Sequence, residues 1–351
     1  METTINFDLG RLQSYQRSKS SARIFLLIIT TCAVTSAVMA SWLPLQLSVA
    51  TVFLFAGPHN WFEFRYFLTR LPIKLGRSRF FFVTAFGGLI GLTLSYVSLP
   101  LIYNATRWTQ ESWLMILATW NTAFLIWLGV LVWQRGTLKH RANWIWAIPI
   151  CVAIGALNWL TPELFSLSLV YVHPLIALWF LDRHLGKIRP VWRSYYRRFL
   201  FFVATLLALM IWQLSHAADL RDDNGLFWRI TQHSGADLLP GLSSHMLVSV
   251  HLYLEILHYG VWLLALPLIT KRVVDRSRIP PSRIFSLKSI PIACHLRGFP
   301  KIVAASLIIL TLAIFALWIG FAVNYSITRD IYFTVAIAHV LAEAPFLLRT
   351  L

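Results

Sequence analysis

The sequence predicts an all-α integral membrane protein, a polytopic bundle of about ten transmembrane helices that forms one domain over residues 1–351. Three observations predict this class. Hydrophobic residues make up 58% of the chain and charged residues only 13%, roughly half the charged share of a soluble domain. The apolar residues gather in runs of about 20, the length of helix that crosses the hydrocarbon core of a bilayer. Most lysines and arginines fall in the short segments between these runs.

Each apolar run is interpreted as one span. Seven of the runs carry no charged residue except at an end, and only the second, eighth and tenth contain a glutamate in their interior. The fifth and sixth runs are short and are separated only by residues 160–163. In chain order the predicted spans are 24–42, 46–68, 80–103, 112–133, 143–160, 163–182, 198–215, 243–270, 301–323 and 331–349.

The distribution of cations predicts the orientation of the spans. If the basic segment 1–23 lies in the cytoplasm, all but four of the 31 lysines and arginines fall on the cytoplasmic side, and both termini lie there. A wrong number of spans would place every later loop on the opposite side of the membrane, and the excess of cations on the cytoplasmic side would disappear. The four exceptions are Arg107, Arg221, Arg229 and Arg329.

The net charge of +17 does not indicate nucleic-acid binding, because the cations are spread over loops that face an anionic leaflet. The expected partners are therefore membrane lipids and a hydrophobic small molecule, with no nucleic acid. The longest external loop, residues 216–242, is predicted to be solvated.

Three glutamates lie where a membrane span should be apolar, and each has a histidine four residues before it. The motifs are His59-x-x-x-Glu63, His251-x-x-x-Glu255 and His339-x-x-x-Glu343, and the middle one continues to His258. Residues four apart share one face of a helix, so His251, Glu255 and His258 are predicted to point in one direction. Buried ionisable groups are costly in a bilayer and are usually functional.

These histidines are also predicted to lie at a common depth. His59, His173, His258 and His339 lie on four different even-numbered spans. They precede a cation at the cytoplasmic end of their span by 10 to 13 residues; these cations are Arg70, Arg183, Lys271 and Arg349. At 1.5 Å per residue this spread is about one helical turn. Four helices thus bring histidine to one layer. A single His–Glu pair can simply neutralise itself between helices, but three pairs with His173 at one depth favour a metal or haem site.

Residues 55–59, Phe-Ala-Gly-Pro-His, followed by an acid, resemble a motif of the Brp/Blh-type integral membrane carotene dioxygenases. This resemblance covers a short stretch and the general architecture. It implies an iron ligand at His59 and, more loosely, at His251, His258 and His339. The three accompanying glutamates depart from the family pattern and leave the reaction and the number of metal ions open.

The leading functional prediction is a membrane metal-dependent enzyme that contains iron, mono- or dinuclear, and oxidises a carotenoid, isoprenoid or acyl chain. Glu63, Glu255 and Glu343 are expected to bridge metal ions or to act as a base. A haem protein with two axial histidines and a proton-coupled transporter with His–Glu relays remain as alternatives. The predicted metal ligands are His59, Glu63, His173, His251, Glu255, His258, His339 and Glu343.

Overall fold

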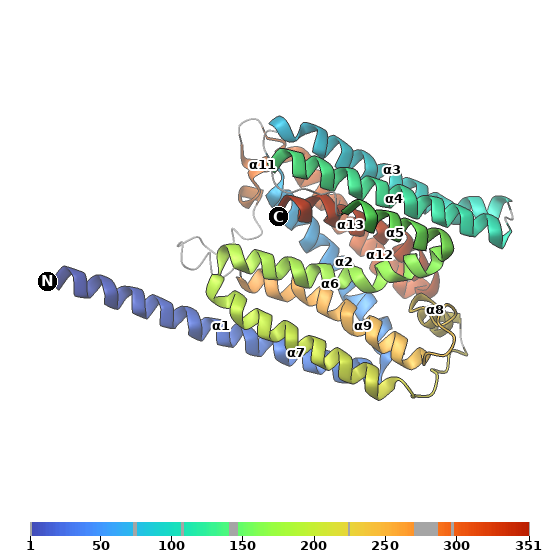
Figure 1. The fold of residues 1–351 in the computed structure, drawn as a ribbon, viewed down its shortest axis with the longest axis horizontal. Helices are drawn as coiled ribbons and strands as arrows, with labels where there is room; N and C mark the ends of the chain where they lie inside the picture. Colours follow the sequence, from blue (N-terminus) through green and yellow to red (C-terminus); the bar gives the residue numbers. More distant parts are fainter. Residues whose placement is uncertain are drawn as a thin grey trace.

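A computed structural model describes residues 2–72, 76–106, 109–139, 147–223, 225–269, 287–295 and 298–350. Within these ranges every regular element is helical and no strand occurs, so the predicted fold class is confirmed. Figure 1 shows the long helices lying side by side in a bundle, with the N-terminal part of the first helix extending beyond it.

The helices follow the order of the predicted spans. Near-complete helical content is expected for a chain in a bilayer, because a helix satisfies its own backbone hydrogen bonds where no water is present. The long helices are α1 (Glu2–Trp42), α2 (Pro44–Arg70), α3 (Arg79–Thr106), α4 (Gln110–Lys139), α6 (Pro162–Ile188), α7 (Pro190–Leu214), α9 (Ser244–Gly260), α12 (Pro300–Val323) and α13 (Tyr325–Thr350). The shorter elements are η1 (Gly76–Ser78), α5 (Ala147–Leu160), α8 (Gly225–His233), the π-helix η3 (Val261–Ala265), η5 (Leu287–Ser289) and α11 (Pro291–Cys294).

Eight of the helical segments in this part of the chain are long and apolar enough to cross a membrane. The two remaining predicted spans differ from these eight for different reasons. Helix α2 has 27 residues but carries Glu63 and Arg65 in its apolar stretch. Helix α5 has only 14 residues, and positions 143–146 of the fifth predicted span lie outside the described residues. The chain is thus a multi-pass membrane protein, and its orientation stays a prediction.

The predicted external loop 216–242 contains a helix that the apolar pattern did not indicate. Helix α8 buries Ile230 and Thr231 and packs against α9, α13 and α2. The Thr231 hydroxyl donates a hydrogen bond to Asp222 at 2.9 Å, so this aspartate does not simply face solvent. The basic loop 271–286, His140 and Arg107 lie outside the described residues.

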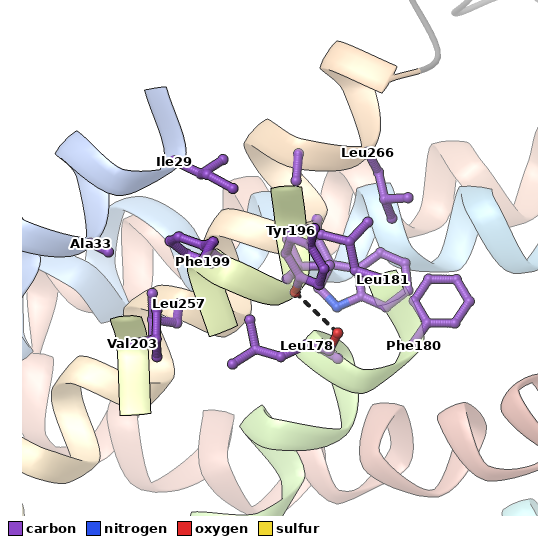
Figure 2. Close-up of a cluster of buried hydrophobic side chains, with 14 of the residues drawn as sticks. Ile29, Ala33, Leu178, Phe180, Leu181, Tyr196, Phe199, Val203, Leu257 and Leu266 are labelled. Carbon is purple, nitrogen blue, oxygen red and sulfur yellow. Dashed lines mark hydrogen bonds between the residues drawn. The ribbon is translucent and has the colours of Figure 1, made fainter. Parts of the chain in front are cut away.

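A large apolar cluster joins α1, α6, α7 and α9. Alanines on one face of α1, among them Ala33, Ala37 and Ala40, are at most 5% exposed. Small side chains let the α1 backbone approach its neighbours closely, which is the main source of helix association in lipid. Figure 2 shows Leu178 and Tyr196 in this cluster, where the tyrosine hydroxyl donates to the Leu178 carbonyl at 3.0 Å.

A buried amide pair joins α4, α5 and α6. The Asn121 side chain donates to the Asn158 carbonyl oxygen at 2.8 Å, and Asn158 donates to the Ala118 backbone carbonyl at 2.9 Å. Asn158 of α5 thus bonds side-chain and backbone groups of the neighbouring helix α4. These hydrogen bonds hold the short helix α5 against the bundle.

Four helices with a histidine at mid-span, α2, α6, α9 and α13, pack against one another. Three of them contain a proline beside the site: Pro58 in α2, Pro174 in α6 and Pro345 in α13. Proline removes one backbone hydrogen bond and bends a membrane helix. The site described below lies where these four helices meet.

Candidate metal centre

Four histidine rings from four helices meet in the interior of the bundle. The centroid of the His59 ring lies 5.4 Å from that of His258 and 5.4 Å from that of His339. His173 completes the group, with its centroid 4.6 Å from His258 and 5.1 Å from His339. The structure thus brings together the four rings that the common-depth argument assigned to one layer.

Two carboxylates join these rings and divide the cluster into two sets of possible ligands. His59, Glu63, His258 and His339 form one set, and His173, His258 and Glu343 form the other. Within each set the ligand atoms lie within 4.8 Å of one another. Ligands at about 2.0–2.2 Å from a shared ion can be at most about 4.4 Å apart, so small side-chain movements suffice to close either set on a metal. We call these six residues the His/Glu cluster.

The environment of His59 determines which ring nitrogen is free. Its Nδ1 lies 3.0 Å from the Phe55 backbone carbonyl, one helical turn earlier. Because a carbonyl oxygen only accepts, Nδ1 carries the proton and Nε2 keeps its lone pair. Nε2 is buried and has no hydrogen-bond partner among the described residues. A histidine held by a backbone carbonyl through one nitrogen, with the other free, is the usual arrangement of a metal ligand.

The rings of His173 and His339 face each other through their nitrogens. The two Nε2 atoms are 3.2 Å apart. Two neighbouring ligands of one ion, each about 2.1 Å from it at a bond angle between 90° and 109°, are separated by about 3.0–3.4 Å. The observed spacing therefore suits a hydrogen bond in one tautomer and a shared ion equally well. The His173 Nδ1 lies 3.3 Å from Glu343 Oε2, which orients the His173 ring.

The carboxylates of Glu63 and Glu343 are buried, 1% and 2% exposed, and interact electrostatically with each other. Apart from this mutual interaction and the 3.3 Å contact of Glu343 Oε2 with His173 Nδ1, their oxygens have no hydrogen-bond partner within the part of the chain that the structure describes. Both nitrogens of His258 are likewise buried without one. Buried polar atoms normally have partners, and two neighbouring carboxylates need a proton or a cation between them. This concentration of unsatisfied acceptors is what a cation site requires.

The four histidines of the His/Glu cluster line one end of a cavity of about 460 Å³. Its middle has apolar walls that include Trp120, Leu169 and Ile337. Its other end is polar and is formed by α8 and the start of α13, with Arg229, Arg329 and Asp330. The cavity thus runs from the His/Glu cluster toward the end of the bundle where α8 lies.

His251 and Glu255 are not brought into either set of ligands. His251 precedes His258 by seven residues, so it shares the helix face but lies about 10 Å further along the axis. Its ring contacts Tyr171 and His233, at centroid distances of 5.7 and 5.2 Å. Glu255 instead accepts a hydrogen bond from the Tyr259 hydroxyl at 2.5 Å. Both side chains line the cavity above the cluster.

Sequence reasoning missed two functional candidates. Tyr259 packs on the His59 ring at a centroid distance of 4.3 Å; its position four residues after Glu255 was the available signal. Arg329, which the sequence places outside the last span, lies within α13 and is only 4% exposed. The predicted start of this span was late because Arg329 and Asp330 interrupt its apolar pattern.

A second cavity of about 600 Å³ lies between α1, α2, α7 and α9. Its walls are mostly apolar, and the Thr51 and Tyr196 hydroxyls in them already bond backbone carbonyls. Met39 and Leu54 line it and are 42% and 50% exposed. Tyr259 lines both cavities. The second cavity therefore lies directly behind the wall of the first.

Comparison with protein-family models, with curated proteins and with solved structures finds no match to this chain.

Proposed function

We propose that this chain is a membrane-embedded, metal-dependent oxidative enzyme that acts on a lipid-soluble substrate and contains non-haem iron. The observation that carries this proposal is the His/Glu cluster, in which four histidines and two glutamates converge in the interior. His59 Nε2 and both nitrogens of His258 have no hydrogen-bond partner there among the described residues. Imidazole and carboxylate together suit iron, manganese or zinc rather than calcium.

A dinuclear centre accounts for the donors better than a mononuclear one. The cluster offers two overlapping sets of ligands, and the two glutamates are neighbours at their junction. Helical bundles build di-metal sites from glutamates and histidines that project inward from several helices. In such a centre Glu63, Glu343 and the four histidines would hold the two ions between them.

The roles of the chain's own groups follow from their positions. His59, His173, His258 and His339 would hold the ions, and the Phe55 carbonyl keeps His59 in the tautomer that leaves Nε2 free to bind one. Bound iron supplies redox chemistry with dioxygen as the oxidant. Glu255 lies in the cavity wall beside the cluster and is the candidate base, with the Tyr259 hydroxyl holding its carboxyl group in place. The apolar middle of the cavity admits a hydrocarbon substrate and excludes water.

Neither alternative explains the cluster as well. A haem with two axial histidines needs its planar ring between them, whereas these four rings lie close to one another. A proton relay explains paired histidines and glutamates, but it does not require four rings to converge on one point.

Elemental analysis of the purified protein, with an absorption spectrum of the same sample, tests the proposal. We expect about two iron ions per chain and no haem band. His258→Ala should remove at least half of the metal and abolish oxidation, because His258 belongs to both ligand sets. His216→Ala, in the exposed segment after α7, is the matched control and should retain both.

Size-exclusion profiles of the two variants establish that each is folded. Wild-type protein that contains no stoichiometric metal after growth in iron-supplemented medium would contradict the proposal and favour the relay.

A further inference from the structure

Arg329 is a buried cation that lines the polar end of the first cavity. The four histidines of the His/Glu cluster line the other end of the same cavity. Its side chain is 4% exposed and lines the cavity, and its guanidinium lies over the Phe333 ring at 4.6 Å. Among the described residues, Nε has no hydrogen-bond partner, and one terminal nitrogen makes only a long 3.4 Å hydrogen bond to the Arg229 carbonyl. A buried positive charge with so few hydrogen bonds is energetically costly unless an anion binds beside it.

The charged groups around Arg329 do not supply that anion within the described chain. Asp330 forms a salt bridge with Arg229, so its charge is already used. Glu255 interacts with Arg329 electrostatically but makes no salt bridge with it, and its Oε1 accepts the hydrogen bond from Tyr259. Burial, and secondly the Arg329 charge, hold the pKa of the His233 imidazole in α8 well below its usual range. His233 is thus neutral, and Arg329 carries the positive charge of this end of the cavity.

The walls between Arg329 and the cluster fit a hydrocarbon chain. Arg329 precedes His339 by ten residues on α13, which is about 15 Å along the helix axis. Leu169, Val170 and Ile337 line the cavity between the two ends. At the outer end Trp228 is 50% exposed, and the Arg229 and Asp330 side chains are 42% and 41% exposed, so the cavity reaches the molecular surface there.

We propose that Arg329 binds the carboxylate head group of a single-chain lipid whose hydrocarbon chain extends along the cavity to the His/Glu cluster. The guanidinium supplies two charge-assisted hydrogen bonds to the carboxylate, and the chain replaces water along the apolar walls. The carbon that meets the cluster is then fixed by its distance from the head group. The identity of the reacting carbon rests on the proposed function, whereas binding of the lipid does not.

Binding of two fluorescent probes tests this assignment. Parinaric acid, a C18 polyene fatty acid, and the corresponding C18 alcohol are titrated into the full-length protein in detergent, with energy transfer from tryptophan as the signal. Wild-type protein should bind the acid at least about tenfold more tightly than the alcohol, because a hydrogen bond to a charged group is lost with the alcohol. Arg329→Gln should abolish this preference, and Arg329→Lys should retain part of it.

Arg198→Gln is the matched control, since it removes the same charge from a helix that does not line this cavity. It should leave the preference unchanged. Equal affinities of wild-type protein for acid and alcohol, or no binding of either, would overturn the proposal. Displacement of the acid by acetate at a similar concentration would also overturn it, because it would show a simple anion site.

The metal content of the same samples separates this inference from the proposed function. A preference for the acid in protein without metal would support the lipid site and refute the enzyme. Metal-loaded protein without that preference would refute the lipid site and support the metal centre.

Discussion

Glu63 and Glu343 are the residues whose charge distinguishes a metal centre from a structural His–Glu network. Each is buried and interacts electrostatically with the other. In a structural network one shared proton would suffice, and an amide could replace either carboxylate with little loss. In a metal centre the negative charge itself binds the cations, and an amide is a much weaker ligand.

Glu63→Gln and Glu343→Gln are therefore expected to lower the bound metal from about two ions per chain to about one or fewer, with the fold retained. Glutamine keeps the shape of the side chain but removes its charge. Metal content by elemental analysis and thermal stability of the same preparation check this. Glu111→Gln, exposed in the first turn of α4, is the control and should change neither. Full metal content in both cluster variants would show that the carboxylates are not ligands.

Two sequence conditions identified the histidines of the His/Glu cluster, and His251 satisfied only one of them. The four-residue spacing of histidine and glutamate predicts a shared helix face, and counting from the cytoplasmic cations predicts a shared depth for His59, His173, His258 and His339. His251 met the first condition but not the second, because residues seven apart on one face differ in depth by about two turns. Both conditions are needed before residues on a membrane helix can be assigned to one centre.

At the scale of the elements, α9 with η3 organises the interior. Helix α9 is almost entirely buried and contributes His258, Glu255 and Tyr259. It continues into the π-helical turn Val261–Ala265. Such turns widen a helix locally and are frequent at functional sites. Here the turn follows Tyr259 and Gly260, at the wall between the two cavities.

Gly260→Leu is expected to weaken binding of long apolar chains that use the second cavity, while metal content stays unchanged. Gly260 lines that cavity in a helical conformation, and a Cβ added there meets no atom within 4 Å. A leucine side chain should therefore fill part of the space without strain. Photo-crosslinking with a diazirine-bearing C20 isoprenoid alcohol, mapped to peptides of α1 and α9, measures occupancy.

Gly91→Leu is the matched control for this measurement, because Gly91 is exposed on α3 and a Cβ there also meets no atom within 4 Å. It should leave the labelling unchanged. Equal labelling of wild-type protein and Gly260→Leu would show that the second cavity does not take the chain.

At the scale of the whole molecule, the bundle encloses a polar site in a largely apolar interior, and its outer surface is apolar as well. Helices such as α12 expose many large apolar residues, including Ile308, Ile309 and Leu312, at 58%, 66% and 61%. A protein in water would bury such a surface, whereas a bilayer solvates it. The long apolar helices and this surface both indicate integral membrane insertion.

Reporter fusions after residues 75, 138, 190 and 285 are expected to report a cytoplasmic location, and fusions after 108, 218 and 324 an external one. The physical reason is that cationic loops are retained on the cytoplasmic side during insertion. Alkaline phosphatase and green fluorescent protein fusions measure the two locations. A reversal that begins at one loop and persists through all later loops would show that α2 or α5 does not cross the membrane.

The sequence by itself determined the fold class and the layer in which the ionisable residues lie. Both depend on local quantities, since helix length, periodicity and distance from a basic loop are fixed by positions along one helix. Only the tertiary structure decided that four helices with a histidine at that layer turn those faces toward one another. It also decided that Arg329 lies within α13. Helix α8, likewise, lies at the end of the cavity only because of the tertiary packing. These features depend on which helices are neighbours and how each is rotated, and packing between residues far apart in the chain sets both.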